Sequence, residues 1–216
     1  MKIGVCIPCH SPYVQYLERL LYSIEKQTVQ PYIVCISLSG IETIPSYSTT
    51  LNLKLIHTSE NKNAGQNRNI AALEIYKNVD VISFIDADDY MHPRRLESLH
   101  AVFSQNMCDV FLHAFADTCK NIPISELETI AKNIEISESH SDNVKLCGDF
   151  IGAYNSIGKD IIIANGHISC ISSVFNTIQV NEHAVGCEDS LFSGTLFAKG
   201  YRVRFTQDKL TLYCRY

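Results

Sequence analysis

The chain has 216 residues, of which 46% are apolar, and a formal net charge of -5 at pH 7. This length suits one sizeable α/β domain with a substantial buried core. The negative net charge and the lack of a run of Lys and Arg argue against broad nucleic-acid binding and against a basic membrane-surface patch.

The cysteines indicate buried thiols rather than a zinc site or a disulfide framework. Nine cysteines are scattered along the chain, and the only CxxC spacing joins Cys6 to Cys9. No second pair completes a zinc site, and several thiols lie in apolar runs, as expected in a reducing compartment. The N-terminal apolar run is too short for a signal peptide and no segment has the length of a membrane span, so we expect a cytoplasmic protein.

Apolar runs and helical patterns alternate along the chain. The predicted elements, in order, are strand 3–7, helix 17–24, strand 32–38, strand 53–57, helix 66–77, strand 81–85, helix 94–105, helix 123–134, strand 168–175 and a helix from Glu188 to Lys199. This alternation predicts a largely parallel sheet covered on both faces. Because such sheets bind ligands beyond the carboxyl ends of their strands, the loops after Ile7, Leu38, His57 and Ile85 are expected to share one site.

Three carboxylates follow the apolar strand 81–85. Asp86, Asp88 and Asp89 emerge where this strand reaches solvent, and charges so close repel one another. Protonation, hydrogen-bond donors or a hard divalent cation must offset the repulsion. Mg²⁺ or Mn²⁺ held by one or two carboxylates completes its shell with water and substrate phosphate, which points to a phosphorylated ligand. The alternative is that one aspartate only caps the helix after Pro93.

Four local patterns occur in one order: IPCH after the first strand, NAGQNRN before the second long helix, DADDYMHP after the buried strand, and CED opening a late helix. Together they resemble the GT-A glycosyltransferases of family 2, which move a sugar from a nucleotide diphosphate donor to an acceptor hydroxyl. The resemblance implies a Rossmann-like, mostly parallel central sheet with helices on both faces, in a single domain over 1–216. We expect a nucleotide-sugar-binding half (1–115) and an acceptor-binding half (116–216), and a longer natural protein is left open.

The resemblance also assigns residues to the nucleotide sugar. They are Pro8, Cys9, His10, Ser37, Ser39, Asn63, Gly65, Arg68, Asn69, Asp86, Ala87, Asp88 and Arg215. Among them, glycine permits close backbone approach and arginine offers a charged fork to phosphate. The alternative for the stretch around Arg68 is a turn and a helix start with the arginine on a solvated face.

In the acidic motif, the resemblance implies that Asp88 faces the nucleotide and, with Asp89, the Mn²⁺ or Mg²⁺ ion, whereas Asp86 orders the loop. As a Lewis acid, the ion stabilises charge on the leaving diphosphate. Asp189 occupies the position of the family's general base, which takes the acceptor proton, and Glu188 is the reserve candidate. By resemblance the reaction inverts the anomeric centre. The alternative is that Glu188 and Asp189 only favour a helix N-terminus electrostatically.

Five positions carry less specific signals. Many family members carry an acidic residue after the second strand, where this chain has Ser37 and Ser39, although a hydroxyl still donates or accepts. Uridine is the preferred base, with thymidine and guanosine left open. His113 and His167 are candidates for the acceptor cleft, with a structural role as the alternative, and Arg215 either helps to hold diphosphate or frays.

The sequence therefore predicts a metal-dependent inverting glycosyltransferase with a UDP-sugar donor and a carbohydrate or glycoconjugate acceptor. It predicts no nucleic-acid partner and no membrane span. One alternative is a sugar-1-phosphate nucleotidyltransferase, although IPCHSPYV lacks the glycine-rich basic loop usual after the first strand. The other alternative is a non-catalytic domain that binds sugar nucleotides or glycans.

Overall fold

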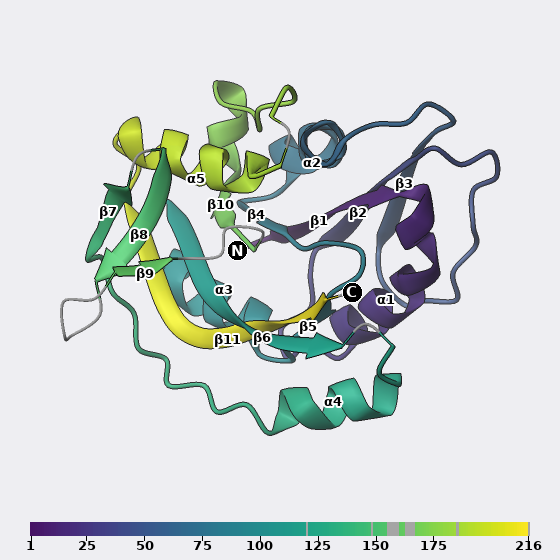
Figure 1. Cartoon of the computed structure of the whole chain (residues 1–216), viewed down its shortest axis with the longest axis horizontal. Helices are drawn as coiled ribbons and strands as arrows, with labels where there is room; N and C mark the ends of the chain where they lie inside the picture. The colour runs from purple at the N-terminus through teal and green to yellow at the C-terminus, as the bar shows by residue number, and fades with distance from the viewer. Residues whose placement is uncertain (120, 148, 155–159, 163–166, 185, 216) are drawn as a thin grey trace.

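The computed structural model describes residues 1–119, 121–147, 149–154, 160–162, 167–184 and 186–215, without the side chains of 119, 147, 150, 152–154, 160–162 and 215. Its strands are β1 Ile3–His10, β2 Ile33–Ser39, β3 Leu53–Thr58, β4 Val81–Phe84, β5 Tyr90–Met91, β6 Val110–Cys119, β7 Val144–Cys147, β8 Phe150–Tyr154, β9 Asp160–Ile162, β10 Ser169–Ile171 and β11 Val203–Arg215. Its α-helices are α1 Leu17–Glu25, α2 Ala64–Ile75, α3 Arg95–Ser104, α4 Ile124–Lys132 and α5 Glu188–Ala198 (Figure 1).

The main sheet is mostly parallel, with the strand order β3-β2-β1-β4-β10-β6-β11-β5. Strands β3, β2, β1 and β4 run parallel, as do β6 and β11. The short strand β10 is antiparallel to both of its neighbours, and β5 is antiparallel to β11. A smaller antiparallel sheet contains β7, β8 and β9. The carboxyl ends of β1 and β4 therefore point the same way, which brings their following loops together.

Helices cover both faces of the sheet, as predicted. Side chains of β1 alternate between the faces: Val5 and Ile7 belong to the cluster that includes α1 and α3, whereas Cys6 belongs to the cluster that includes α2 and α5. Helix α4 instead packs beside β5 and β11, where Leu127 meets Tyr90 and Leu212. Within the described residues, none of the helices combines the length and apolar character required to cross a bilayer.

The cysteines on the central strands are buried free thiols, as the sequence indicated. Cys6, Cys35 and Cys170 are free and have no exposed surface. Burial raises the pKa of Cys35 and of Cys170 to about 12. These side chains act as small apolar groups in the core.

The predicted strand 168–175 is wrong in its second half. Strand β10 contains only Ser169–Ile171, and Ser172–Asn176 forms a 3-10 helix. At this point the Ser172 amide donates to Asp80 O (2.9 Å) and its hydroxyl donates to Val79 O (2.6 Å). These two bonds tie the chain to the start of β4 and turn it out of the sheet.

Candidate active site

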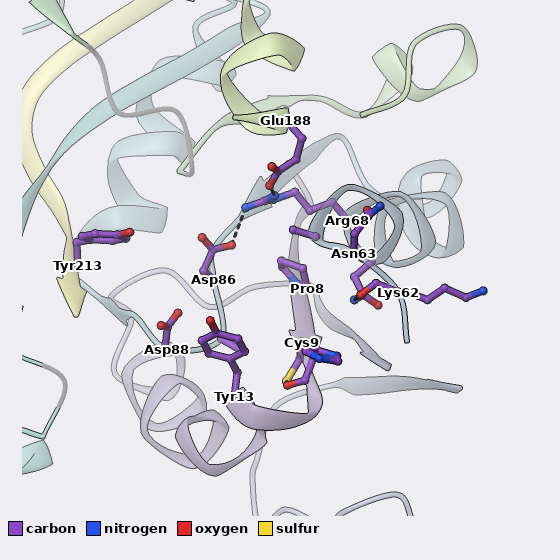
Figure 2. A pocket seen from close by; sticks show the side chains of 14 residues that line it. Pro8, Cys9, Tyr13, Lys62, Asn63, Arg68, Asp86, Asp88, Glu188 and Tyr213 are labelled. Carbon is purple, nitrogen blue, oxygen red and sulfur yellow. Dashed lines mark hydrogen bonds and ion pairs between the residues drawn. The ribbon is translucent and has the colours of Figure 1, made fainter. Parts of the chain in front are cut away.

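A cavity of about 360 Å³ lies beyond the carboxyl ends of β1 and β4 (Figure 2). This volume is at the lower end of the range for small-molecule sites. The predicted site residues in its wall are Pro8, Cys9, His10, Asn63, Arg68, Asp86, Ala87, Asp88 and Glu188. The structure thus brings together the ends of β1 and β4 with the first turns of α2 and α5, which are far apart in sequence.

Arg68 joins two carboxylates in the wall of this cavity. Its Nη2 donates to Asp86 Oδ1 (2.7 Å), and its Nη1 donates to Glu188 Oε1. The Arg68 side chain is only 3% exposed, whereas that of Asp86 is 30% exposed. Arg68 is therefore not on a solvated face, and the sequence alternative that placed it there is excluded.

The ionisation of this triad reflects burial and mutual charge. Burial opposes the charged form of Arg68, but Asp86 and Glu188 outweigh it and raise the pKa of the guanidinium. Burial also raises the pKa of Asp86 to about 6, against the lowering effect of Arg68. Nearby Asp88 adds to this increase because like charges disfavour ionisation. A cation bound near Asp88 would relieve that repulsion.

The acidic motif forms a turn, in which the Asp89 amide donates to Asp86 O (3.2 Å). Asp88 points into the cavity, and its carbonyl accepts a hydrogen bond from Arg19. The N-cap of α3 is Arg94, and β5 lies between the motif and that helix. None of the three aspartates caps α3, so this alternative is also excluded.

The structure departs from the predicted metal role of Asp89. Its side chain has no exposed surface and does not line the cavity. Asp89 Oδ1 accepts from the Cys214 amide on β11 (3.1 Å), and Oδ2 lies 3.7 Å from His167 Nε2. Burial, followed by the charges of Asp86 and Asp88, raises the pKa of this carboxyl well above its usual range. Asp89 therefore connects the acidic turn to β11 beneath the cavity.

Ser37 and Ser39, predicted to contact the base, do not reach the cavity either. Both are buried on β2, where they bind the side chain of Asn67. The Ser37 hydroxyl donates to Asn67 Oδ1 (2.8 Å), and Asn67 Nδ2 donates to Ser39 Oγ (2.9 Å). Since Asn67 itself lines the cavity, the two serines act by holding this amide in place.

Gly65 and Asn69 fix helix α2 against the segment before α5 instead of lining the cavity. A β-carbon on Gly65 would lie 2.9 Å from Asn181 O, so glycine permits this close approach. The side chain of Asn69 accepts through Oδ1 from Val180 N (2.8 Å). Its Nδ2 donates to Val180 O (2.9 Å) and to Glu182 Oε1 (2.8 Å).

Asn63 combines a structural role with a place in the cavity wall. It caps α2 in a capping box with Gln66, because each side chain accepts from the backbone amide of the other. Its Nδ2 also donates to Glu182 O (2.7 Å). Together with Gly65 and Asn69, this contact couples the position of Arg68 on α2 to the chain that leads into α5.

The first turn of α5 carries both predicted acid-base candidates. Glu188 lies in the cavity wall and is held by Arg68, and its side chain is 13% exposed. Asp189 is partly exposed, and its Oδ1 accepts from the Ser190 amide (2.6 Å). Asp189 does not line the cavity, but its charge acts on both Asp86 and Arg68. The two carboxylates are therefore neighbours with different surroundings.

His113 and His167 are buried and stack on each other, with ring centroids 5.5 Å apart. Burial, reinforced by the charge of Arg95, lowers the pKa of both imidazoles well below its usual range. Their surroundings match the structural alternative raised from the sequence rather than an open acceptor cleft. The side chain of Arg215 lies outside the described residues.

The oxygen donors in the cavity fit a divalent cation such as Mg²⁺ or Mn²⁺, which needs few ligands from the protein itself. Among the residues that the structure describes, no group of three or more His, Cys, Asp or Glu side chains is placed to hold a metal. Mg²⁺ and Mn²⁺ in phosphate-binding sites, however, use one or two carboxylates and take their other ligands from phosphate and water. Asp88, whose carboxylate faces the cavity, offers that donor.

The sequence matches the family described as Glycosyl transferase family 2 over residues 4–154. The chain belongs to glycosyl transferase family 2. The matched range includes the cavity residues on β1, α2 and the acidic turn, and it ends before α5. A comparison with curated protein sequences finds no match.

Solved structures show that this family 2 chain has a GT-A glycosyltransferase fold. It is 18% identical to S. aureus TarS 1-349 in complex with UDP (TM-score 0.66), with 100% of this chain and 61% of that chain covered. The UDP-GlcNAc complex of the same protein gives 18% identity, a TM-score of 0.64, and coverage of 100% and 59%. A197 from STIV is 12% identical over 96% of this chain and 83% of that one, with a TM-score of 0.50. The family 2 chain thus spans about three fifths of TarS 1-349, and it covers 37% of the chain in a further TarS structure.

Sequence reasoning missed several residues in the cavity wall of this family 2 chain, namely Tyr13, Lys62, Ala64, Asn67 and Tyr213. Lys62 and Asn67 lie next to or within the NAGQNRN pattern, so the same loop could have identified them. Tyr13 follows β1 in the 3-10 helix Ser11–Tyr16, which gives no periodic signal. Tyr213 reaches the cavity from the end of β11, which pairs with β6. Its sequence signal was its place two residues before Arg215, in a YxR-like ending that resembles that of related enzymes, although no contact was assigned to the tyrosine itself.

Proposed function

We propose that this chain transfers a sugar from a nucleoside diphosphate sugar to a hydroxyl of a carbohydrate or glycoconjugate acceptor. The observation that carries the proposal is the meeting of Asp86, Asp88 and Arg68 in one cavity beyond β1 and β4. Family membership supports it, and the UDP and UDP-GlcNAc complexes of the TarS fold relative favour a uridine donor. In this proposal residues 1–115 bind the nucleotide part of the donor, and the acceptor-binding surface lies within residues 116–216.

The donor half holds the nucleoside and neutralises the charge of the diphosphate. Pro8, Cys9 and His10 form the wall at the end of β1, which suits the nucleoside. Asp88 holds a Mn²⁺ or Mg²⁺ ion, which when bound supplies Lewis-acid stabilisation of charge on the diphosphate. Arg68 keeps Asp86 and Glu188 in place, so these two carboxylates of the cavity wall remain oriented while the donor binds.

Asp189 is the proposed general base. The acceptor oxygen forms a bond to C1 of the donor sugar while the bond from C1 to the diphosphate oxygen breaks, and the acceptor proton moves to the Asp189 carboxylate. Attack from the side opposite the leaving group inverts the anomeric centre. Glu188 is less suited to this task because its Oε1 is bound to Arg68.

The test compares two adjacent carboxylates, Asp88 in the cavity and Asp89 beneath it. Asp88→Asn should weaken Mn²⁺-dependent UDP binding at least about tenfold, because the neutral amide oxygen attracts a divalent cation less strongly than a carboxylate does. Asp89→Asn keeps the oxygen that accepts from Cys214 and is the matched control, with binding expected within about twofold of wild type. Titration calorimetry with UDP and Mn²⁺ measures both.

Turnover distinguishes a transferase from a binding domain. Wild-type protein incubated with UDP-sugars and Mn²⁺ should release free UDP slowly, since water can replace the acceptor. Binding without any UDP release would support the non-catalytic alternative. Equal loss of Mn²⁺-dependent binding in both variants, or in neither, would refute the metal role of Asp88.

A further inference from the structure

Tyr213 stands in the cavity wall on the side away from the end of β1. Figure 2 shows Pro8 and Cys9 on one side of the cavity, Tyr213 on the other, and Asp86 and Asp88 between them. Tyr213 comes from β11, on the far side of the sheet from β2 and β3. It contributes an aromatic surface on the side of the cavity remote from the proposed nucleoside wall.

The ring of Tyr213 is held by other rings. Phe115 on β6 meets it edge-to-face, with centroids 5.2 Å apart and an interplanar angle of 65°. His167 makes a similar contact at 6.2 Å and 76°. Such edge contacts orient an aromatic ring and contribute beyond the area that they bury. Tyr213 nevertheless remains 36% exposed, so part of its surface faces the cavity.

The backbone beside Tyr213 is fixed as well. The amide of the next residue, Cys214, donates to Asp89 Oδ1 (3.1 Å), and Asp89 is buried directly after the cavity residue Asp88. Tyr213 itself pairs with Asp117 of β6. The aromatic ring and the acidic turn are therefore tied together by a short path through the protein.

A nucleotide sugar places its groups in linear order: nucleoside, diphosphate, sugar. If the nucleoside lies against β1 and the diphosphate lies near Asp88, the sugar extends toward Tyr213. A sugar ring has an apolar face of C–H groups, and these groups carry partial positive charge that is attracted to the negative face of an aromatic ring. Asp86 and Glu188, in the same cavity, supply acceptors for the sugar hydroxyls.

We propose that Tyr213 is the contact residue for the donor sugar and recognises the apolar face of its ring. This inference rests on the proposed function of the same cavity. It assigns sugar recognition to the end of β11 and not to the β1 and α2 loops that hold the nucleotide. Tyr213 therefore contributes to the affinity for UDP-sugar and leaves the affinity for UDP unchanged.

The test separates the sugar from the nucleotide. Titration calorimetry with Mn²⁺ measures the Kd for UDP and the Kd for whichever of UDP-glucose, UDP-galactose and UDP-GlcNAc most raises the wild-type melting temperature. Tyr213→Leu keeps an apolar side chain on β11 but removes the flat ring, and Tyr213→Phe retains the ring. Tyr32→Ala is the matched control, because Tyr32 is 45% exposed and lies at the other end of the sheet strands.

Tyr213→Leu should weaken binding of the UDP-sugar about tenfold while UDP binding changes less than twofold. Tyr213→Phe and Tyr32→Ala should leave both constants within about twofold of wild type. If Tyr213→Leu fails to fold, as judged by its melting curve, Tyr213→Met provides the same comparison. Equal weakening of UDP and UDP-sugar, or no weakening of either, overturns the proposal. Failure of wild-type protein to bind UDP instead contradicts the proposed function on which it rests.

Discussion

Two charged regions lie one above the other in this molecule and differ in their access to solvent. The cavity holds Arg68, Asp86 and Glu188 as a partly exposed ion-pair network. Below it, a buried polar layer contains Asp89, Arg95, His113 and His167, each at most 2% exposed. The adjacent residues Asp88 and Asp89 belong to different regions, although the sequence presents them as equivalent.

In the lower layer, burial opposes the charged form of each of these four groups. Burial lowers the pKa of Arg95 to about 9, raises that of Asp89 and lowers those of both histidines. Arg95 Nη1 donates to Thr211 Oγ1 (2.9 Å), and Nη2 donates to Ser83 Oγ (3.0 Å) and Phe84 O (2.6 Å), whereas Nε has no hydrogen-bond partner among the described residues. Polar residues near the site thus line the cavity in the upper region and hold strands together in the lower one.

The largest expected effect concerns Asp189 beside the cavity. Asp189→Asn should lower sugar transfer by at least about a hundredfold, because general-base catalysis typically contributes that much. Binding of UDP and Mn²⁺ should persist, since Asp189 does not line the cavity. Calorimetry combined with a transfer assay measures the two quantities separately. Loss of donor binding together with activity would leave the base assignment without support.

The next prediction concerns the stability that the Arg68 ion pairs with Asp86 and Glu188 contribute. Arg68→Met leaves Asp86 and Glu188 without their shared cation, so we expect a loss of roughly 3 kcal/mol in the free energy of unfolding. Urea denaturation measures it. The matched control is Arg94→Met, which also removes an arginine that pairs with two carboxylates, Glu97 and Glu138, but all three side chains are at least 37% exposed. A pair in solvent contributes little, and equal losses in the two variants would contradict the special position of Arg68.

The smallest effect tests whether the lower layer holds its histidines neutral. The folded-state pKa of His113 is depressed by burial and by Arg95 and His167, so the unfolded chain binds more protons below pH 6.5. Stability is therefore fully present above that pH and is lost as the pH falls. At pH 5.5 His113 should account for about 1.4 kcal/mol of the wild-type loss.

His113→Phe tests this directly, because it removes the titrating ring from a fully buried position. Unfolding by urea at pH 7.5 and at pH 5.5 should show a smaller acid-induced loss in the variant than in wild type. His167 retains its own contribution in both proteins. Identical losses would mean that His113 is already protonated in the folded state or is not the group responsible.

The sequence was most informative for the first half of the fold. Strands β1 to β4 and helices α1 to α3 were predicted because continuous apolar runs alternate with helical spacing there. Strands β6 and β11 were missed. Strand β6 carries an apolar run that is interrupted by the buried His113, and β11 alternates apolar with polar residues on each side of the polar stretch 206–209, where its register shifts. These interruptions divide each pattern into short pieces, none of which was long enough to be assigned as a strand.

Site residues that directly follow a strand could be predicted from the sequence. Whether a neighbouring side chain lines the cavity or is buried beneath the surface could not. Pro8, Arg68, Asp86 and Asp88 meet in the cavity because strand ends of a parallel sheet converge. Ser37, Ser39 and Asp89 share the same sequence neighbourhoods but point inward. A shift of one residue along a strand or turn reverses the direction of a side chain. Sequence spacing alone therefore does not specify which of two adjacent side chains faces the cavity.

The hydrogen bonds of the Asn69 side chain limit which residues can replace it. Its amide meets both backbone groups of Val180, accepting from the N–H and donating to the C=O, as a neighbouring peptide group would. Aspartate at this position would lack the donor, leucine would lack both functions, and glutamine would add a methylene in a buried space. Asparagine alone provides both groups at this reach, so a variant library built on this scaffold should leave position 69 unchanged.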